Sequence, residues 1–331
     1  MTGRSRCAGG IRLSSPAIAD NTRAMSAAAS PPPDRSISSR NLSGIMLIVA
    51  AVLVFSCIDA SAKWLNRSLP PLQIAGIRYL GSFLLVGVFL NPWTKPRLLQ
   101  TANVRRQVAR SLCLVLMTGL SFVALRYLPL AQFTAINFAS PLIVALLAGP
   151  VLGEKIGPRR LAAVVVGLGG VLVVTRPFAH GMHPAVFLVC IMACAGAVYA
   201  LLTRMIAAHD RPETTMFYTG GVGALIMTPV LPFVWRDPAT AANYVAIVVM
   251  CIAGSLGHWL MILAHRAAPA SVLAPFNYMQ LVGAVAIGRL VFGETPDHWT
   301  LIGGAIVIGS GLYLLYRERE RKKYPSADVP V

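Results

Sequence analysis

The chain has 331 residues, of which 56% are hydrophobic and only 12% are charged. A soluble domain usually carries about 25% charged residues, so this composition excludes an ordinary soluble globular protein. The formal net charge of +17 could suit a nucleic-acid-binding protein. However, the basic residues lie between long apolar runs, where they flank membrane helices, and no nucleic-acid partner is expected.

Residues 1–42 differ from the rest because they are rich in Ser, Ala, Pro and Arg, with the run SPPPD at 30–34. They contain no apolar core segment, which excludes a secretory signal peptide. An organelle transit sequence, and a start codon upstream of a true start at Met25, are left open as alternatives. The composition favours a disordered cytoplasmic tail over 1–42.

Ten apolar runs follow, each near the length of roughly 20 residues that a helix needs to cross a bilayer. The expected spans are 44–65, 70–90, 109–128, 130–152, 159–176, 183–206, 213–233, 241–264, 270–292 and 298–316. This pattern predicts an all-α integral membrane fold, followed by a basic cytoplasmic tail over 318–331.

Asp59 and Arg78 are ionisable side chains well inside the first two spans. Such a group at mid-membrane costs roughly 2.5–3.5 kcal/mol, so each needs a partner or a function. At about 1.5 Å per residue, the two side chains lie at similar depths, which makes an ion pair between them feasible. The pair would be a structural clamp, a charge site for substrate or a proton relay. Lys63, one turn from Asp59, could join it or extend to the interface.

The fifth span contains Gly167, Gly169 and Gly170. The apolar context and the absence of a further motif glycine argue against a dinucleotide-binding loop. Small residues let membrane helices approach closely, so a tight helix–helix contact is predicted here.

The chain contains an internal repeat with an offset of 140 residues. Paired at that offset are Arg126 and Arg266, Pro129 and Pro269, Asn137 and Asn277, Gly153–Glu154 and Gly293–Glu294, and Gly169 and Gly309. These matches fall on Arg, Pro, Asn, Gly and Glu, whereas chance matches in such a chain would mostly fall on Leu, Val and Ala. They indicate duplication of a five-helix unit, assigned to 43–178 and 183–317. Because five is odd, the second copy enters the membrane from the opposite side.

The charge of the repeated turn agrees with this inversion, because basic residues follow Gly153–Glu154 and none follow Gly293–Glu294. With both termini cytoplasmic, sixteen Lys and Arg lie in the inside loops and C-terminal tail, against four in the outside loops. Positive residues concentrate on the cytoplasmic side, so a multi-pass protein of the cell (inner) membrane with both termini inside is predicted. Each turn glutamate is expected to cap the next helix, with a role in transport chemistry as the alternative.

Polar groups occupy equivalent places in the fourth and ninth spans. Asn137 and Asn277 each lie close to a proline, Tyr278 adjoins Asn277, and Gln280 lies one turn further on the same face. Proline frees a backbone carbonyl, and broken membrane helices often line substrate cavities. These groups are therefore predicted to line a cavity between the repeats, with interhelical hydrogen bonding as the alternative.

The eighth span carries His258, the only histidine deep inside a predicted span, beside Trp259. Stacking on a planar substrate or coupling to protons is one interpretation, and a neutral packing histidine is the other. Tyr199 and Tyr218 are expected to form aromatic walls of the cavity.

The repeated segments are also recognisable. RYLPLAQFTAINFASPLIVALLAGPVLGEKI (126–156), RAAPASVLAPFNYMQLVGAVAIGRLVFGETP (266–296) and GGAIVIGSGLYLLYRER (303–319) resemble the EamA family of the drug/metabolite transporter superfamily. The resemblance covers about 44–318 and implies a ten-helix carrier built from two inverted five-helix repeats.

Shorter motifs narrow the resemblance. DASAKWL (59–65), GIRYL (76–80) and GHWLMILAHR (257–266) are similar to a subgroup that includes carriers for uptake of S-adenosylmethionine or riboflavin. Other relatives export amino acids or their analogues, so the resemblance leaves both direction and cargo open.

These observations predict a secondary transporter of a small polar organic metabolite, working by alternating access around a central cavity. The sequence has no HExxH, GxSxG or Walker motif and no metal-ligand spacing, so neither enzymatic activity nor a cofactor is expected. The alternatives are an exporter of amino acids or drug-like compounds, a lipid flippase, a membrane substrate sensor or an intramembrane enzyme. The expected partners are a small-molecule substrate and the lipid bilayer. A coupling proton or counter-substrate, and a monomer or homodimer, stay open.

Overall fold

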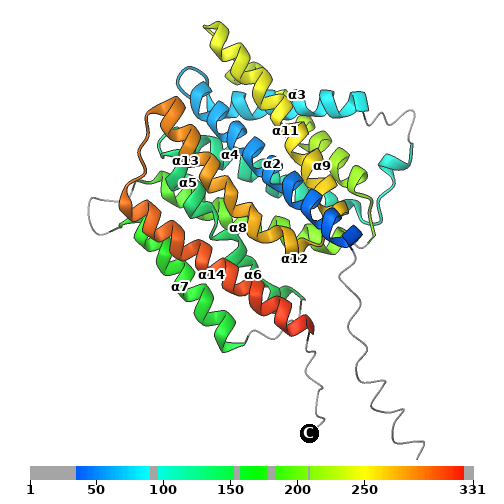
Figure 1. Cartoon of the computed structure of the whole chain (residues 1–331). Helices are drawn as coiled ribbons and strands as arrows, with labels where there is room; N and C mark the ends of the chain where they lie inside the picture. Colours follow the sequence, from blue (N-terminus) through cyan, green and yellow to red (C-terminus); the bar gives the residue numbers. More distant parts are fainter. Residues whose placement is uncertain (1–34, 90–95, 153–156, 178–182, 208, 324–331) are drawn as a thin grey trace, which may run out of the picture. The chain divides into compact units, whose positions relative to one another are not determined.

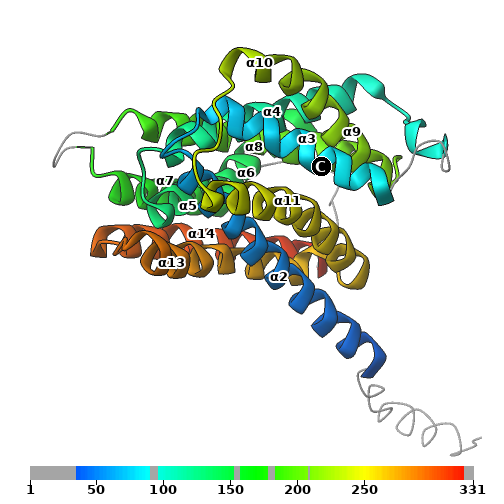
Figure 2. The same ribbon diagram turned by 90° about the horizontal axis from the view of Figure 1, so that it is seen from above.

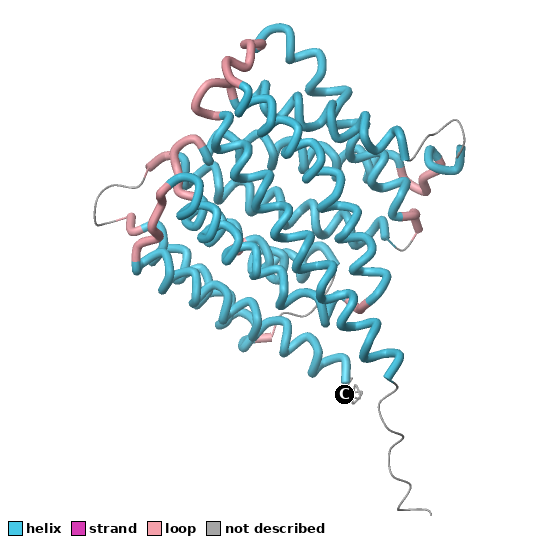
Figure 3. The backbone as a smooth tube through the Cα atoms, turned by 45° about the horizontal axis from the view of Figure 1, so that its top comes forward, coloured by secondary structure: helices cyan, strands magenta, loops and turns pink. Residues whose placement is uncertain are grey.

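A computed structural model gives the fold, and the residues it describes are 35–89, 96–152, 157–177, 183–207 and 209–323. The chain divides into two compact units, Met1–Ser39 and Arg40–Val331. Of the first unit, only the helical residues 35–39 are described. Within the described residues, the second unit consists of helices and their connections, with no β-strand (Figures 1 and 3). The predicted all-α fold is confirmed.

Long helices joined by short connections make up the described part of the chain, and the first of them, α2, begins in the first unit. In chain order the elements are α2 (Arg35–Leu65), α3 (Pro71–Phe89), η2 (Pro96–Leu99), α4 (Val104–Leu125), α5 (Leu130–Asn137), α6 (Ser140–Leu152), α7 (Pro158–Thr175), α8 (Ala185–Ala207), α9 (Pro212–Met227), η3 (Thr228–Val230), α10 (Leu231–Val234), α11 (Ala241–Ala267), α12 (Ala270–Leu273), η4 (Ala274–Tyr278), α13 (Met279–Phe292) and α14 (His298–Lys323). The η elements are short 3₁₀ turns.

Nine stretches of the described residues are long and apolar enough to cross a membrane, and they correspond to nine predicted spans. The remaining predicted span, 270–292, is divided into α12, η4 and α13, and α13 alone has only 14 residues. The three elements follow one another directly, so together they complete the second five-helix repeat.

The helix breaks occur at equivalent positions of the two repeats. In the first repeat α5 ends at Asn137 and α6 begins at Ser140, and in the second the turn η4 spans Ala274–Tyr278. Pro141 and Pro275 have no backbone N–H to donate to the residue four positions earlier, so a continuous α-helix is not maintained. The predicted interruption of both spans near these prolines is confirmed.

The structure differs from the predicted spans at the chain ends. Helix α2 begins at Arg35 and α14 continues to Lys323, although their membrane-length apolar parts are Asn41–Leu65 and His298–Arg317. Apolar patterning marks where lipid begins, whereas a helix continues into water as long as its backbone hydrogen bonds are made. The predicted disordered tail over 1–42 therefore ends in helix, and its residues 1–34 lie outside the described part of the chain.

Helix α7 packs along α14, as Figures 1 and 2 show, and glycines make this contact close. A Cβ atom on Gly170 would lie 2.9 Å from the Gly303 carbonyl oxygen, and one on Gly303 would lie 2.6 Å from the Gly170 carbonyl oxygen. A Cβ on Gly167 would overlap Ser310, whereas one on Gly169 would meet nothing within 4 Å. The predicted close helix approach is confirmed for two of the three glycines.

Candidate functional site

A cavity of about 450 Å³ lies among α3, α4, α8, α9 and α11. Helix α3 packs against α9 and α11, and α4 packs against α8 and α9 (Figure 2). Residues of these five helices line the cavity. It extends to Asp210 in the α8–α9 connection and to Arg266 near the end of α11. Its volume is typical of a small-molecule site.

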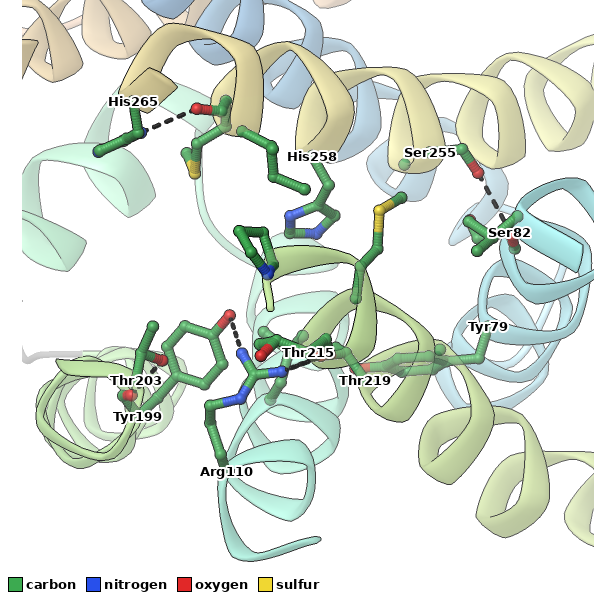
Figure 4. A pocket seen from close by; sticks show the side chains of 18 of the residues that line it. Tyr79, Ser82, Arg110, Tyr199, Thr203, Thr215, Thr219, Ser255, His258 and His265 are labelled. Atoms are coloured by element: carbon green, nitrogen blue, oxygen red, sulfur yellow. Dashed lines mark hydrogen bonds between the residues drawn. The ribbon is translucent and has the colours of Figure 1, made fainter. Parts of the chain in front are cut away.

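Arg110 of α4 is buried and directed into this cavity (Figure 4). Its Nη1 donates to the Tyr199 hydroxyl at 2.8 Å, and its Nη2 donates to the Thr215 carbonyl at 2.9 Å and to the Thr219 hydroxyl. The guanidinium carbon also lies 5.0 Å from the centre of the Tyr199 ring. Every one of these acceptors is neutral, and Arg110 forms no ion pair with any described residue.

Arg78 of α3 is the second buried arginine of the cavity. Its Nη1 donates to the Thr118 hydroxyl at 3.2 Å, and its guanidinium carbon lies 5.1 Å from the Tyr79 ring centre. The Tyr79 and Thr118 hydroxyls are themselves 3.0 Å apart. In both arginines the Nε atom is buried without a hydrogen-bond partner, so the protein satisfies neither guanidinium completely.

The α11 wall combines an imidazole with small polar groups. His258 projects toward the cavity in Figure 4 and meets Phe55 edge-on, with ring centres 5.2 Å apart. Ser255 donates to the Ser82 carbonyl at 3.3 Å, while Ser82 donates to the Cys251 carbonyl at 3.2 Å. These reciprocal bonds hold α11 against α3.

The cavity mouth is organised around Asp210. Its carboxylate accepts from the Ala102 amide at 2.8 Å, from the Gln107 amide at 2.8 Å and from the Thr101 hydroxyl. Burial alone would raise the pKa of the Asp210 carboxyl, but these hydrogen bonds to its charged form outweigh burial and hold the pKa below its ordinary value. Asp210 thereby links the α3–α4 and α8–α9 connections.

Of the ten side chains predicted as a substrate site, three line this cavity: Arg78, Tyr199 and His258. Tyr218 does not line it but donates its hydroxyl to the Leu99 carbonyl at 3.0 Å. Trp259 is 39% exposed and likewise absent from the lining. Consecutive residues on a helix point about 100° apart, so His258 and Trp259 face different surroundings.

The proposed Asp59–Arg78 ion pair is not formed. The Asp59 carboxylate instead accepts from the Gln280 amide at 3.3 Å, and Arg78 donates to Thr118. Asp59 and Arg78 were predicted to pair because they lie at similar depths in the membrane. Depth, however, does not specify the direction in which a side chain points around its helix. Asp59 and Gln280 are outside the cavity lining, and their contact joins α2 to α13.

The other predicted amides lie at the helix breaks. Asn137 ends α5 and Asn277 lies in η4, and neither lines the cavity. Their neighbours Phe138 and Tyr278, themselves 140 residues apart, meet edge-on with ring centres 5.0 Å apart. Residues that contact their own repeat equivalents lie at the pseudo-symmetry axis, so the two breaks meet there.

Glu294 caps a different helix from the predicted one. Its carboxylate accepts from the Leu130 amide at 3.0 Å, which caps the start of α5, whereas Asp297 caps α14 by accepting from the Thr300 amide at 2.8 Å. The prediction that Glu294 caps the next helix is therefore wrong. Gly293, with a φ of 68°, ends α13 in the left-handed conformation. The equivalent Glu154 lies outside the described residues.

Glu294 also forms an ion pair with Lys63, which donates to the Leu128 carbonyl at 2.6 Å. This contact joins the end of α2 to the α4–α5 and α13–α14 connections. Lys63 therefore pairs at the helix end and does not join Asp59. A second ion pair, between Arg176 and Asp297, links the end of α7 to the start of α14.

Arg110 is a buried, cavity-lining residue that is absent from the candidate site residues predicted from the sequence. The count of sixteen cytoplasmic charges includes Arg110, although it is the second residue of the predicted span 109–128. The structure buries it within α4, which leaves fifteen. A signal was present in the sequence. Gln107, Arg110 and Ser111 are spaced three and four residues apart, the spacing of one helix face, and all three are buried.

A mainly apolar cavity that contains a few buried polar and charged side chains, inside a bundle of membrane-length helices built from two repeats, is the architecture of a multi-pass membrane transporter. The chain matches the EamA-like transporter family twice, over residues 42–176 and 183–317, and it belongs to that family. Its function class is therefore that of a transporter and not of an enzyme.

Individual relatives carry several transport functions. The chain is 26% identical over 280 residues to an S-adenosylmethionine uptake transporter of Rickettsia prowazekii, covering 84% of this chain and 94% of that one. It is 27% identical over 299 residues to a riboflavin transporter of Rhizobium johnstonii, covering 87% and 96%. It is 28% identical over 279 residues to the pseudopaline exporter CntI of Pseudomonas aeruginosa, covering 80% and 93%. The resemblance to the S-adenosylmethionine and riboflavin subgroup is confirmed.

A solved crystal structure shares the fold, with a TM-score of 0.59 and 18% sequence identity. The match covers 84% of this chain and 98% of the other. At this identity the likeness concerns the fold alone.

Proposed function

We propose that this chain is a secondary transporter that moves a small polar organic metabolite by alternating access through the cavity among α3, α4, α8, α9 and α11. The observation that carries the proposal is the cavity itself. It holds Tyr199, His258 and the only two charged side chains in the buried class within the described residues, Arg78 and Arg110. Polar and ionisable groups placed inside a membrane protein mark substrate paths, because their burial is otherwise unfavourable.

Alternating access requires that one end of the path be closed while the other is open. The cavity reaches the end of the bundle at Asp210 and Arg266. At the opposite helix ends, the Lys63–Glu294 and Arg176–Asp297 ion pairs bind neighbouring connections together. This arrangement is that expected for one state of an alternating-access carrier, in which the ion-paired end is closed and the end at Asp210 and Arg266 is open.

Both termini lie in the cytoplasm in this proposal, because Lys and Arg concentrate in the loops of that side. The cavity mouth at Asp210 then opens to the cytoplasm, and Glu294 lies at the external end. Relatives named for uptake and for export match at similar identity, so the proposal includes both directions.

The test combines binding and transport. Purified protein is screened against metabolites for thermal stabilisation, since a ligand that binds the folded state raises its stability. A stabilising compound is then assayed for saturable uptake into proteoliposomes. Thr203→Phe, which fills the cavity from α8, is expected to abolish uptake, and Val198→Phe, on the exposed side of the same helix, is the matched control. Binding without uptake by the parent protein would indicate a sensor and overturn the proposal.

A further inference from the structure

Two arginines stand out among the buried residues of this chain. Arg78 and Arg110 are the only charged side chains in the buried class within the described residues, at 9% and 2% exposure. Both line the same cavity. By contrast, Arg176 and Arg266, which are more exposed, each form an ion pair with a carboxylate. The arginines with the least access to water are therefore those that form no ion pair with a described carboxylate, although Asp59 interacts electrostatically with Arg78.

From this placement we propose that Arg78 and Arg110 form an oxyanion subsite, which binds a carboxylate or phosphate group of the transported molecule. The inference rests on the proposed transport function and specifies the chemical class of its cargo as an organic anion. It also assigns Arg110, which lies outside the predicted polar set, as a binding residue.

The energetic argument concerns charge compensation. A buried ion that lacks a counter-charge is unfavourable even when several of its hydrogen bonds are made. Arg110 uses three of its five N–H donors on neutral acceptors, and Arg78 uses one on the Thr118 hydroxyl. An oxyanion in the cavity would supply the missing negative charge and accept from the remaining donors.

The surrounding groups hold the guanidinium planes in place. Tyr199 lies against Arg110 and Tyr79 lies against Arg78, each with its ring centre about 5 Å from the guanidinium carbon. A positioned guanidinium presents a planar fork that matches carboxylate and phosphate oxygens in a bidentate arrangement, which a lysine cannot reproduce.

The charges at the mouth do not neutralise these arginines. Asp210 is engaged by Thr101, Ala102 and Gln107 and forms no ion pair with a described arginine. Glu213 is paired with Arg266. Asp59 interacts electrostatically with Arg78 from outside the lining, but one carboxylate against two guanidinium groups still leaves a net positive charge in the deep part of the cavity. That charge favours an anion over a neutral or cationic molecule.

Matched probes test this chemistry on the full chain. Detergent-purified protein is titrated with succinate against succinamide, nicotinate against nicotinamide, and glycerol 3-phosphate against glycerol, following the unfolding temperature. Each pair shares a scaffold and differs in the anionic group. At least one acid is expected to stabilise the protein while its neutral partner does not. The carboxylate and phosphate pairs distinguish the two oxyanions.

Variants then locate the site. Arg110→Gln is expected to weaken acid binding tenfold or more, and Arg110→Lys, which keeps charge but loses the fork, by a smaller factor. Arg78→Gln provides a second test if Arg110→Gln fails to fold. Arg105→Gln, an exposed arginine at the start of the same helix, is the matched control and should bind as the parent does.

The outcomes separate the subsite from the transport function. Equal stabilisation by acids and their neutral partners, or unchanged acid affinity in folded Arg110→Gln and Arg78→Gln, overturns the oxyanion subsite. Saturable uptake of a neutral probe with no uptake of its acid also overturns it, while transport itself stands. Arginine-dependent acid binding without uptake supports the subsite and overturns the proposed transport.

Discussion

The Lys63–Glu294 ion pair should be a principal stabilising contact at its end of the bundle, and Glu294→Gln tests this. The two side chains are only 15% and 22% exposed. Exposed pairs contribute about 0–1 kcal/mol, whereas breaking a buried pair costs about 3–5 kcal/mol. A pair of intermediate burial should lie between these limits, so the expected loss is about 2 kcal/mol.

The substitution isolates the charge. A glutamine oxygen can still accept from the Leu130 amide, so the cap of α5 is kept, and Lys63 keeps its bond to the Leu128 carbonyl. The loss therefore comes from leaving the lysine charge without its counter-ion. Adding Lys63→Met to the variant should recover part of the stability, because the unpaired charge is removed.

The assay is the unfolding free energy of purified protein in a fixed detergent. Asp297→Asn is the matched control, because its pair with Arg176 is about one-third exposed on both sides. Asparagine caps a helix as well as aspartate does, so α14 retains its cap and the expected loss stays below about 1 kcal/mol. If Glu294→Gln lost no more unfolding free energy than Asp297→Asn, the idea that the more buried ion pair is the stronger one would be refuted.

Three further predictions concern packing, pH and orientation. Gly170→Ala should cost roughly 1–3 kcal/mol by overpacking the α7–α14 contact, whereas Gly169→Ala should be neutral or stabilising; equal unfolding temperatures would contradict this. Asp210→Asn should lose up to about 1 kcal/mol at neutral pH. Because the folded-state pKa of Asp210 is lowered, its contribution exists above its ordinary pKa and disappears as pH falls through the lower value, so parent and variant should converge in acid. A cysteine at Asp297 should react with an impermeant reagent outside intact cells and one at Gly157 should not, and the reverse pattern would exclude the proposed orientation.

The sequence determined the class of fold because the controlling signals are local or repeat at a fixed offset. An apolar run that crosses the membrane must be helical, because its backbone N–H and C=O groups find no water in lipid and must hydrogen-bond to one another. The 140-residue offset identifies two copies of one unit, and prolines near Asn137 and Asn277 locate the helix breaks. The glycines of the fifth span likewise predicted a close helix contact, since only small residues permit it.

The site depended on tertiary structure because the direction of a side chain around its helix, and the helix it meets, are not local properties. Asp59 and Arg78 have similar depths, yet Asp59 contacts Gln280 on α13 and Arg78 faces the cavity with Arg110. Arg110 is the second residue of the predicted span 109–128, where the sequence suggests a charge at a helix end. Only the packing of α4 against α8 and α9 buries it against Tyr199 and Thr215. Local patterning thus defines which segments form helices, whereas the packing of separate helices decides which polar groups share one cavity.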